Sequence, residues 1–180
     1  MCAKLKNVEL INNLKNLAFE DSLTRLPNRR LLFELFEKYA TDADRNNSKL
    51  AILFIDLDKF KFVNDDYGRE VGDYVLTEVA ITMVAALRKV DIAARLGGDE
   101  FVAILKDINS DEDANLVVDK IKYALNKNIT VNNVPVHISA SIGVAIYPDQ
   151  SRSLEKLLKI SDRSMYANKG EILLCNHSIR

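Results

Sequence analysis

The chain has 180 residues, of which 48% are hydrophobic and 28% charged, and its formal net charge is −1. This length and composition are typical of one folded domain with a short appendage, and they exclude a disordered chain. The balanced charge argues against binding long nucleic acid by bulk electrostatics, so any nucleotide would be held by local contacts.

The cysteines and histidines are too scattered to form a disulfide framework or a metal cluster. Cys2 and Cys175 lie near opposite ends of the chain, and His137 and His177 have no partner at ligand spacing. Any bound metal would therefore be held by carboxylates. Carboxylates favour a hard ion such as Mg²⁺, with Mn²⁺ as the alternative.

The N-terminus has neither a signal-peptide pattern nor an apolar run near the roughly 20 residues that span a bilayer. We expect a cytoplasmic domain without membrane contact of its own, which can still be the cytosolic part of a membrane-bound protein. Residues 4–18 have leucines on one helical face, in a stripe too short to be stable alone. Two interpretations stay open: residues 1–18 are a linker helix from an upstream sensor domain, or they pack on the domain at residues 19–180.

The segment up to residue 68 predicts one helix and one buried strand. A loop marked by Pro27 and Asn28 precedes a helix whose apolar face carries Leu31, Leu32, Leu35 and Phe36. Residues 50–55 are continuously apolar, which is typical of a central strand buried on both faces. Residues 64–68 are rich in turn-forming residues, so we expect a turn there.

The remaining elements are three helices, one hairpin and one long strand. The helices are expected at residues 73–87, 111–126 and 154–169, and the inward face of the second carries Leu116, Val117, Ile121 and Leu125. In the last helix, Met165 and Tyr166 are expected in the core. The hairpin joins strands at residues 92–96 and 101–105, and residues 134–147 alternate as one strand. The hairpin excludes an all-parallel sheet, so we expect an α+β sandwich with a mixed, mainly antiparallel central sheet flanked by helices.

Two acidic residues follow the buried strand. Asp56 stands where the strand emerges, and Asp58 comes two residues later, so in an extended chain both carboxylates point the same way. Taken alone, the pair is more typical of a solvated strand end or a helix N-cap than of a functional site.

The hairpin turn Gly97-Gly98-Asp99-Glu100 strengthens the functional interpretation. Two successive glycines admit positive φ and let a ligand approach the backbone closely. The two carboxylates that follow would repel each other unless a cation or hydrogen-bond donors compensate. A plain turn explains the glycines but not the flanking Arg95 and Phe101. If the two strands are neighbours, Asp56 and Asp99 can reach one Mg²⁺ between them.

Four motifs follow one another along the chain: Asp21-x-Leu23-Thr24-x-Leu26-x-Asn28-Arg29-Arg30, Asp56-x-Asp58-x-Phe60-Lys61-x-x-Asn64-Asp65 with Gly68, Gly72-Asp73 and Leu76, Arg95-Leu96-Gly97-Gly98-Asp99-Glu100-Phe101, and Asp162-x-x-Met165-Tyr166-x-x-Lys169. Together they resemble the GGDEF family of diguanylate cyclases, from about Phe19 to Lys169. The resemblance implies a fold like the palm domains of nucleotidyl cyclases and polymerases. It also implies a bacterial signalling enzyme that condenses two GTP molecules into cyclic di-GMP.

The resemblance further implies a catalytic set of Asp56, Asp99 and Glu100. Asp56, Asp99 and the backbone carbonyl of Leu57 would hold the metal ions, and Glu100 would help to position metal or phosphate. Asp99, or a metal-bound hydroxide beside it, would help to deprotonate the ribose 3′-hydroxyl that attacks an α-phosphate while pyrophosphate leaves.

The residues implied to bind GTP are Phe60, Lys61, Asn64, Asp73, Gly97, Gly98 and Lys169. Among them, Asn64 and Asp73 would read the guanine edge, because an amide and a carboxylate match its acceptor and donor groups. The two lysines would neutralise the triphosphate, and the two glycines would let the backbone pass close under the phosphates. Each domain of the family binds one GTP, so catalysis implies a homodimer.

Arg88 and Asp91 match the RxxD motif at which the family binds cyclic di-GMP as an inhibitor. A guanidinium can fork onto guanine or phosphate, while a carboxylate accepts from guanine N–H groups. The alternative interpretation is a structural salt bridge at a helix C-terminus.

The sequence departs from the family at a few positions. Arg69 stands where the family usually has His, and residues 171–174 replace an ending usually rich in Arg and Asn, which puts triphosphate affinity in question. One alternative function is therefore a weak or inactive GGDEF domain that serves as a GTP or cyclic di-GMP sensor. Another is a structural module whose dimerisation relays signals. The intact metal-binding acids argue for the enzyme, since a pure receptor has no need of them.

Overall fold

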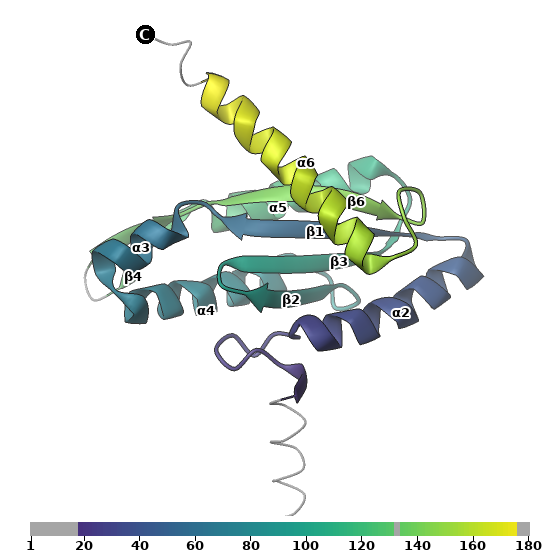
Figure 1. Ribbon diagram of the computed structural model, residues 1–180, viewed down its shortest axis with the longest axis horizontal. Helices are drawn as coiled ribbons and strands as arrows, with labels where there is room; N and C mark the ends of the chain where they lie inside the picture. Colours follow the sequence, from purple (N-terminus) through teal and green to yellow (C-terminus); the bar gives the residue numbers. More distant parts are fainter. Residues whose placement is uncertain (1–17, 132–133, 176–180) are drawn as a thin grey trace, which may run out of the picture.

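A four-stranded sheet with the strand order β2-β3-β1-β6 forms the centre of the computed structural model, which describes residues 18–131 and 134–175 (Figure 1). The strands are β1 (Lys49–Leu57), β2 (Ile92–Gly97), β3 (Glu100–Ile108) and β6 (Ala140–Tyr147). Each of the three pairings is antiparallel. The expected α+β sandwich is confirmed, and its central sheet is antiparallel across these pairings.

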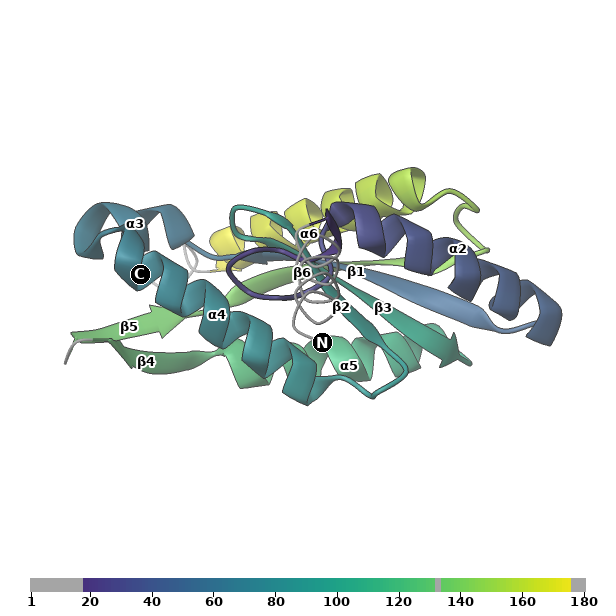
Figure 2. The same ribbon diagram turned by 90° about the horizontal axis from the view of Figure 1, so that it is seen from below.

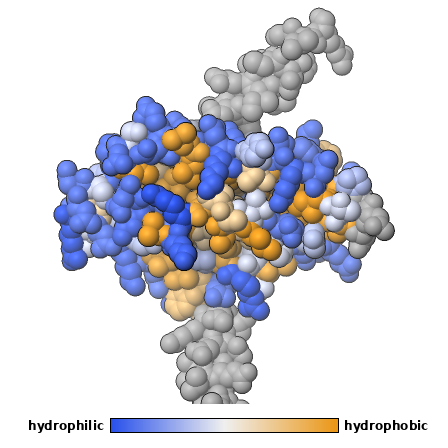
Figure 3. Space-filling model, turned by 180° about the vertical axis from the view of Figure 1, so that it is seen from behind, coloured by the Kyte–Doolittle hydropathy of each residue, from blue (hydrophilic) through white to orange (hydrophobic). Residues whose placement is uncertain are grey.

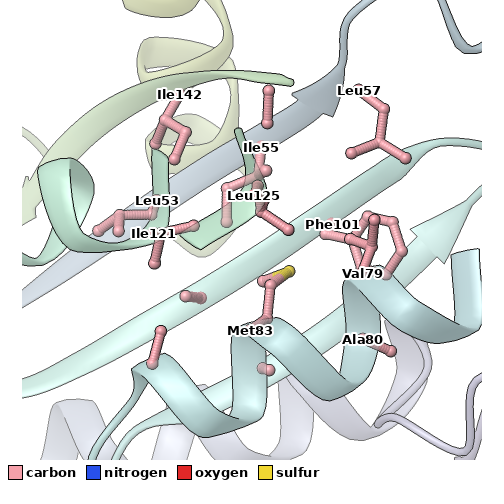
Figure 4. Packing of buried hydrophobic residues seen from close by; sticks show 14 of the residues in the cluster. Leu53, Ile55, Leu57, Val79, Ala80, Met83, Phe101, Ile121, Leu125 and Ile142 are labelled. Carbon is pink, nitrogen blue, oxygen red and sulfur yellow. The ribbon is translucent and has the colours of Figure 1, made fainter. Parts of the chain in front are cut away.

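Helices cover both faces of this sheet (Figure 2). α2 (Arg29–Asn46) and α6 (Leu154–Cys175) cover one face, while α4 (Arg69–Ala86) and α5 (Asp111–Leu125) cover the other. Successive side chains of a strand point to opposite faces, so β1 serves two cores. Leu50, Ile52 and Phe54 pack under α2 and α6. Leu53, Ile55 and Leu57 pack under α4 and α5 (Figure 4). This double burial explains why β1 is continuously apolar.

The close packing of α6 on β6 depends on Gly143. A Cβ atom at this position would lie 1.9 Å from the backbone oxygen of Ser161 and 2.5 Å from the backbone nitrogen of Met165. Because those contacts are with helix backbone, no side-chain rearrangement can relieve them. Gly143 therefore sets how closely α6 approaches the sheet.

The structure corrects two predicted segments. Residues 64–68 were expected as a turn, but residues 64–67 belong to the helix α3 (Phe60–Tyr67), in which Phe60 is buried and which ends before Gly68. Residues 134–147 are two strands, β5 (Val134–Ile138) and β6, separated at Ser139. β5 pairs with β4 (Lys127–Val131) in a separate ribbon. An uninterrupted alternation of apolar and polar residues shows which side chains share a face of the strand, but it does not show with which strand the segment pairs.

Two residues expected in the core are exposed. Leu116 of α5 is 69% exposed, and Tyr166 of α6 is 63% exposed. The buried face of α5 is instead Ala114, Val118, Ile121 and Leu125. Seen from behind, the side of the molecule that carries α4 and α5 shows apolar residues at its surface among polar ones (Figure 3). Met165, by contrast, is buried as expected.

Most of the expected linker helix (residues 1–18) lies outside the described residues, which begin at Ala18. In the part of the chain that is described, no helix combines the length and the apolar character needed to cross a membrane.

Candidate active site

The β2–β3 hairpin turns at Gly98 and Asp99, with Gly97 at the end of β2 and Glu100 at the start of β3. Gly97 has φ +143° and Gly98 has φ +56°, conformations that side chains disfavour. Open space surrounds both α-carbons, since a Cβ at either position would meet no atom within 4 Å. The hairpin backbone is therefore accessible to a ligand, as the sequence predicts.

Arg95 fixes this turn to the loop that precedes α2. Its Nε and Nη2 donate to the Gly98 carbonyl at 3.0 and 2.7 Å, and its Nη1 donates to Asp21 Oδ1 at 2.9 Å. Asp21 also accepts from the backbone N–H and the hydroxyl of Thr24. Burial alone would raise the pKa of Asp21, but the hydrogen bonds from Thr24 and Arg95 outweigh it and lower this pKa. Arg95 thus positions the hairpin, a role that its sequence position alone left unexplained.

Two of the acidic residues predicted for catalysis, Asp56 and Glu100, lie on one face of the sheet. Asp56 of β1 is directly opposite Glu100 of β3 and Ser141 of β6. Residues directly opposite each other in antiparallel strands share a face, here the one covered by α2 and α6. The strand that carries Asp56 and the strand that follows the glycine turn are therefore neighbours, which is the condition for Asp56 and Asp99 to reach one metal ion.

Negative charge converges on Glu100. Burial raises its pKa above the ordinary value of 4.5, and the carboxylates of Asp56, Asp99 and Asp162 raise it further, while Arg29 acts in the opposite direction. Asp162 reaches this cluster from α6, and its contribution was not foreseen although it belongs to the C-terminal motif. The repulsion is what a bound divalent cation would relieve.

The available donors suit Mg²⁺ better than a metal that needs a full protein cage. Within residues 18–131 and 134–175, no three His, Cys, Asp or Glu side chains are arranged to hold a metal ion by themselves. Mg²⁺ typically takes one or two carboxylates and completes its shell with phosphate and water oxygens. Asp56 and Asp99, with the carbonyl of Leu57 at the end of β1, match that requirement.

Asp58 has a structural part beside this cluster. It accepts hydrogen bonds from the hydroxyls of Ser139 and Ser141, both at 2.7 Å, and its backbone N–H donates to the Ser139 carbonyl. These bonds fasten the end of β1 to the start of β6. Asp58 therefore holds the strand end on which Asp56 is presented.

The residues predicted to read guanine meet where α3 crosses α4. A Cβ at Gly72 would lie 2.0 Å from Asn64 Oδ1, so the missing side chain makes room for the Asn64 amide. Asp73, the next residue, is exposed on α4, and Lys61 is exposed on α3. Phe60 is buried beside them. Lys169 lies in α6, but its side chain is outside the described part of the structure.

The arrangement of acids, glycine turn and helix junction agrees with a comparison against known families. Residues 18–172 match the model described as "Diguanylate cyclase, GGDEF domain". The chain belongs to the GGDEF domain family.

Relatives of this GGDEF domain are known in Pseudomonas aeruginosa. It is 41% identical over 165 residues to the bifunctional diguanylate cyclase/cyclic di-GMP phosphodiesterase MucR. The matched region covers 92% of this chain and 23% of MucR. It is 38% identical over 160 residues to the diguanylate cyclase TpbB. The matched region covers 88% of this chain and 37% of TpbB. The solved GGDEF domain of TpbB superposes with a TM-score of 0.80 at 38% identity, over 84% of this chain and 89% of that one. The chain thus spans less than two fifths of these two curated relatives.

The RxxD residues of this GGDEF domain are bonded to each other. Arg88 Nε and Nη2 donate to the Asp91 carboxylate at 3.1 Å, and Nη2 also donates to the Lys106 carbonyl at 2.7 Å. Asp91 further accepts from the backbone N–H groups of Arg88 and Lys106. The hydrogen bond with Asp91 raises the pKa of Arg88. The Asp91 side chain is 1% exposed and that of Arg88 is 56% exposed. The salt bridge of the alternative interpretation is therefore present, and a ligand would first meet Arg88.

Proposed function

We propose that this GGDEF domain is a diguanylate cyclase that condenses two GTP molecules into cyclic di-GMP and releases two pyrophosphates. One observation carries the proposal: Asp56 and Glu100 face each other at adjacent strand ends beside a glycine turn that presents Asp99. Acids placed together in this way are suited to a cation and a polyphosphate. The name of TpbB, a diguanylate cyclase, supports the same conclusion.

The proposed reaction is nucleotidyl transfer. The 3′-oxygen of one ribose forms a bond to the α-phosphorus of the other GTP, and the bond from that phosphorus to the bridging oxygen breaks. Pyrophosphate leaves with the electron pair, and the 3′-hydroxyl proton passes to a carboxylate, for which Asp99 is the candidate. Bound Mg²⁺ or Mn²⁺ would neutralise phosphate charge. Asp56, Asp99 and the Leu57 carbonyl would hold it, and Glu100 would help to position the phosphates.

Substrate binding would use the helix junction and the hairpin together. Asn64 and Asp73 would pair with the guanine edge, and adenine would leave both mispaired. Lys61 and Lys169 would neutralise the triphosphate, while Gly97 and Gly98 would pass beneath it. Each domain would hold one GTP, so two domains must face each other as a homodimer. The relatives are longer proteins, in keeping with control by an upstream domain.

Product inhibition is proposed at the RxxD site. Cyclic di-GMP would bind the exposed part of the Arg88 guanidinium, which can fork onto phosphate or guanine. Asp91 would have to give up part of its present pairing to accept from guanine. We therefore expect Arg88→Ala to relieve inhibition by added cyclic di-GMP while turnover without product stays the same.

A turnover assay tests the proposal. The purified chain at high concentration is incubated with GTP and Mg²⁺ beside Asp99→Ala, and the nucleotides are separated by chromatography. Cyclic di-GMP from the wild type alone is the expected result. Tight GTP binding without product, unchanged when two copies are joined by a dimerising fusion, would favour the alternative of an inactive GGDEF domain that acts as a nucleotide sensor. Absence of GTP binding would contradict both and favour a structural module.

A further inference from the structure

Arg29, the first residue of α2, begins its helix close to the acidic cluster. Its position is fixed on both sides: Arg95 of β2 donates its backbone N–H to the Pro27 carbonyl at 3.0 Å, and the Asn28 side chain accepts from Leu31 N at 3.1 Å as the helix cap. The N-terminus of α2 is therefore tied to the strand that leads into the glycine turn.

Glu100 projects from the face of the sheet that α2, the helix of Arg29, covers. Glu100 is two residues before Val102, which packs under α2, so both project toward this helix. Arg95, whose backbone N–H bonds to Pro27, lies directly opposite Phe101, the residue that follows Glu100 in β3. The positive charge of Arg29 acts on Glu100 and on Glu155 of α6. Arg29 thus brings positive charge to the end of the sheet where Asp56, Asp99 and Asp162 bring negative charge.

The Arg29 side chain is available to a ligand. The residue is exposed, and its guanidinium carbon lies over the Phe33 ring, 5.5 Å from the ring centroid. Among the described residues it forms no salt bridge. Its neighbour Arg30 differs, since it pairs with Glu34 at 3.5 Å and stacks on Phe19.

We propose that Arg29 is a further substrate-binding residue, which contacts the β- and γ-phosphates of the nucleotide. The inference rests on the proposed function, because it needs a nucleoside triphosphate at the acidic cluster. A triphosphate placed among four carboxylates brings further negative charge to this end of the sheet. Arg29 would add to the positive charge proposed for the cation, Lys61 and Lys169, and a guanidinium can bind phosphate oxygens in a bidentate manner. The competing explanation is that Arg29 serves only as a surface partner of Glu155.

Binding measurements with nucleotides of different phosphate number separate these explanations. The full chain, Arg29→Ala, Arg29→Lys and the matched control Arg30→Ala are titrated by calorimetry with Mg²⁺. The ligands are GMP, GDP and a GTP analogue with a methylene α,β-bridge. We expect Arg29→Ala to weaken binding of the GTP analogue roughly tenfold and binding of GDP by a smaller factor. The affinity for GMP should not change. Arg29→Lys should retain part of the affinity, and Arg30→Ala should resemble the wild type.

The outcomes distinguish the inference from the function on which it rests. If the wild type binds the analogue and Arg29→Ala binds it equally well, the phosphate contact is wrong and the proposed cyclase stands. Equal weakening of all three ligands would also overturn it, because a general structural change does not depend on phosphate number. If the wild type fails to bind the analogue at all, the proposed function falls, and the inference falls with it.

Discussion

The two ends of the central sheet treat charge in opposite ways. At the end where β1 begins, Arg152 and the Tyr147 hydroxyl both bond to Asp44, and Lys49 pairs with Asp149. The hydrogen bond from Tyr147, followed by that from Arg152, lowers the pKa of Asp44, and pairing raises the pKa values of Lys49 and Arg152. Asp44 and Lys49 each have an internal partner of opposite sign there.

At the other end, where β1 finishes, like charges gather instead. Asp56, Asp99 and Asp162 all raise the pKa of Glu100 in addition to its burial. The same fold can evidently pair its charges when the only requirement is stability. Acids held together against their repulsion are typical of functional sites, which supports the metal binding proposed for this end of the sheet.

The largest effect is expected from removing one carboxylate charge at the end of the sheet where acids gather, and the same change at the opposite end is the control. Asp56→Asn should lower cyclic di-GMP production about a hundredfold to a thousandfold, because the metal loses a carboxylate ligand. Asp44→Asn, the same chemical change at the paired end, should leave turnover unchanged and lower the melting temperature. Rates and thermal melts of both variants test the contrast. Equal loss of activity in the two would show that the ends do not differ in function.

The next effect tests whether α6 must lie close to the sheet to bring Asp162 to the acidic end. Gly143→Ala should lower the free energy of unfolding by about 3 kcal/mol, because its methyl group meets the helix backbone. Ala145→Gly, two residues along the same face, should lower it by about 1 kcal/mol through strand entropy and lost contact. Urea unfolding measures both. A Gly143→Ala variant as stable as the wild type would mean that α6 can move away freely.

A smaller loss is expected from releasing the hairpin. Arg95→Met keeps the side chain's length but removes its bonds to Gly98 and Asp21, and should lower unfolding free energy by about 1–3 kcal/mol. The turn that presents Asp99 would then be less fixed, so turnover should fall as well. A double-mutant cycle with Asp21→Asn isolates the bridge itself. If the losses in unfolding free energy of the two single variants add up in the double variant, Arg95 holds the hairpin independently of Asp21 in the loop that precedes α2.

Sequence patterns predicted the parts of this structure that are determined locally. The apolar run of β1 and the two glycines of the hairpin each have one good structural solution, and both were found. The register of α5 was missed because its predicted and observed faces share Ile121 and Leu125. At the other two positions, packing buries Ala114 and Val118 in place of Leu116 and Val117, and alanine gives a weak hydrophobic signal.

The candidate site shows the same division. Its acids were named from motifs, but the direct opposition of Asp56 and Glu100 required the strand register. Arg95 was noticed without a role, because its partner Asp21 lies 74 residues earlier in the chain. Asp162 joins the cluster only because α6 folds back across β6. Contacts between distant segments are set by tertiary packing, on which local pattern carries no information.

The smallest expected effect isolates the repulsion itself. The folded-state pKa of Glu100 is raised, so ionised Glu100 destabilises the fold above that pKa, and the penalty vanishes below the ordinary value of 4.5, where the group is protonated in both states. Glu100→Gln should therefore stabilise the metal-free protein near neutral pH by about 0.5 kcal/mol, a small amount because solvent screens an exposed carboxylate. The gain should disappear in acid.

Glu155→Gln is the matched control for this change. Hydrogen bonds from the Ser153 hydroxyl and from its own backbone lower the pKa of Glu155, so its ionised form stabilises the fold above its unfolded pKa. The control should accordingly lose stability near neutral pH, the opposite sign from Glu100→Gln. Melting temperatures of both variants across the acid range, with and without Mg²⁺, measure the difference. Added Mg²⁺ should raise the melting temperature of the wild type more than that of Glu100→Gln, because the wild type alone has the charge repulsion of Glu100 to relieve. A loss of stability in Glu100→Gln at neutral pH would mean that the cluster is already compensated within the chain.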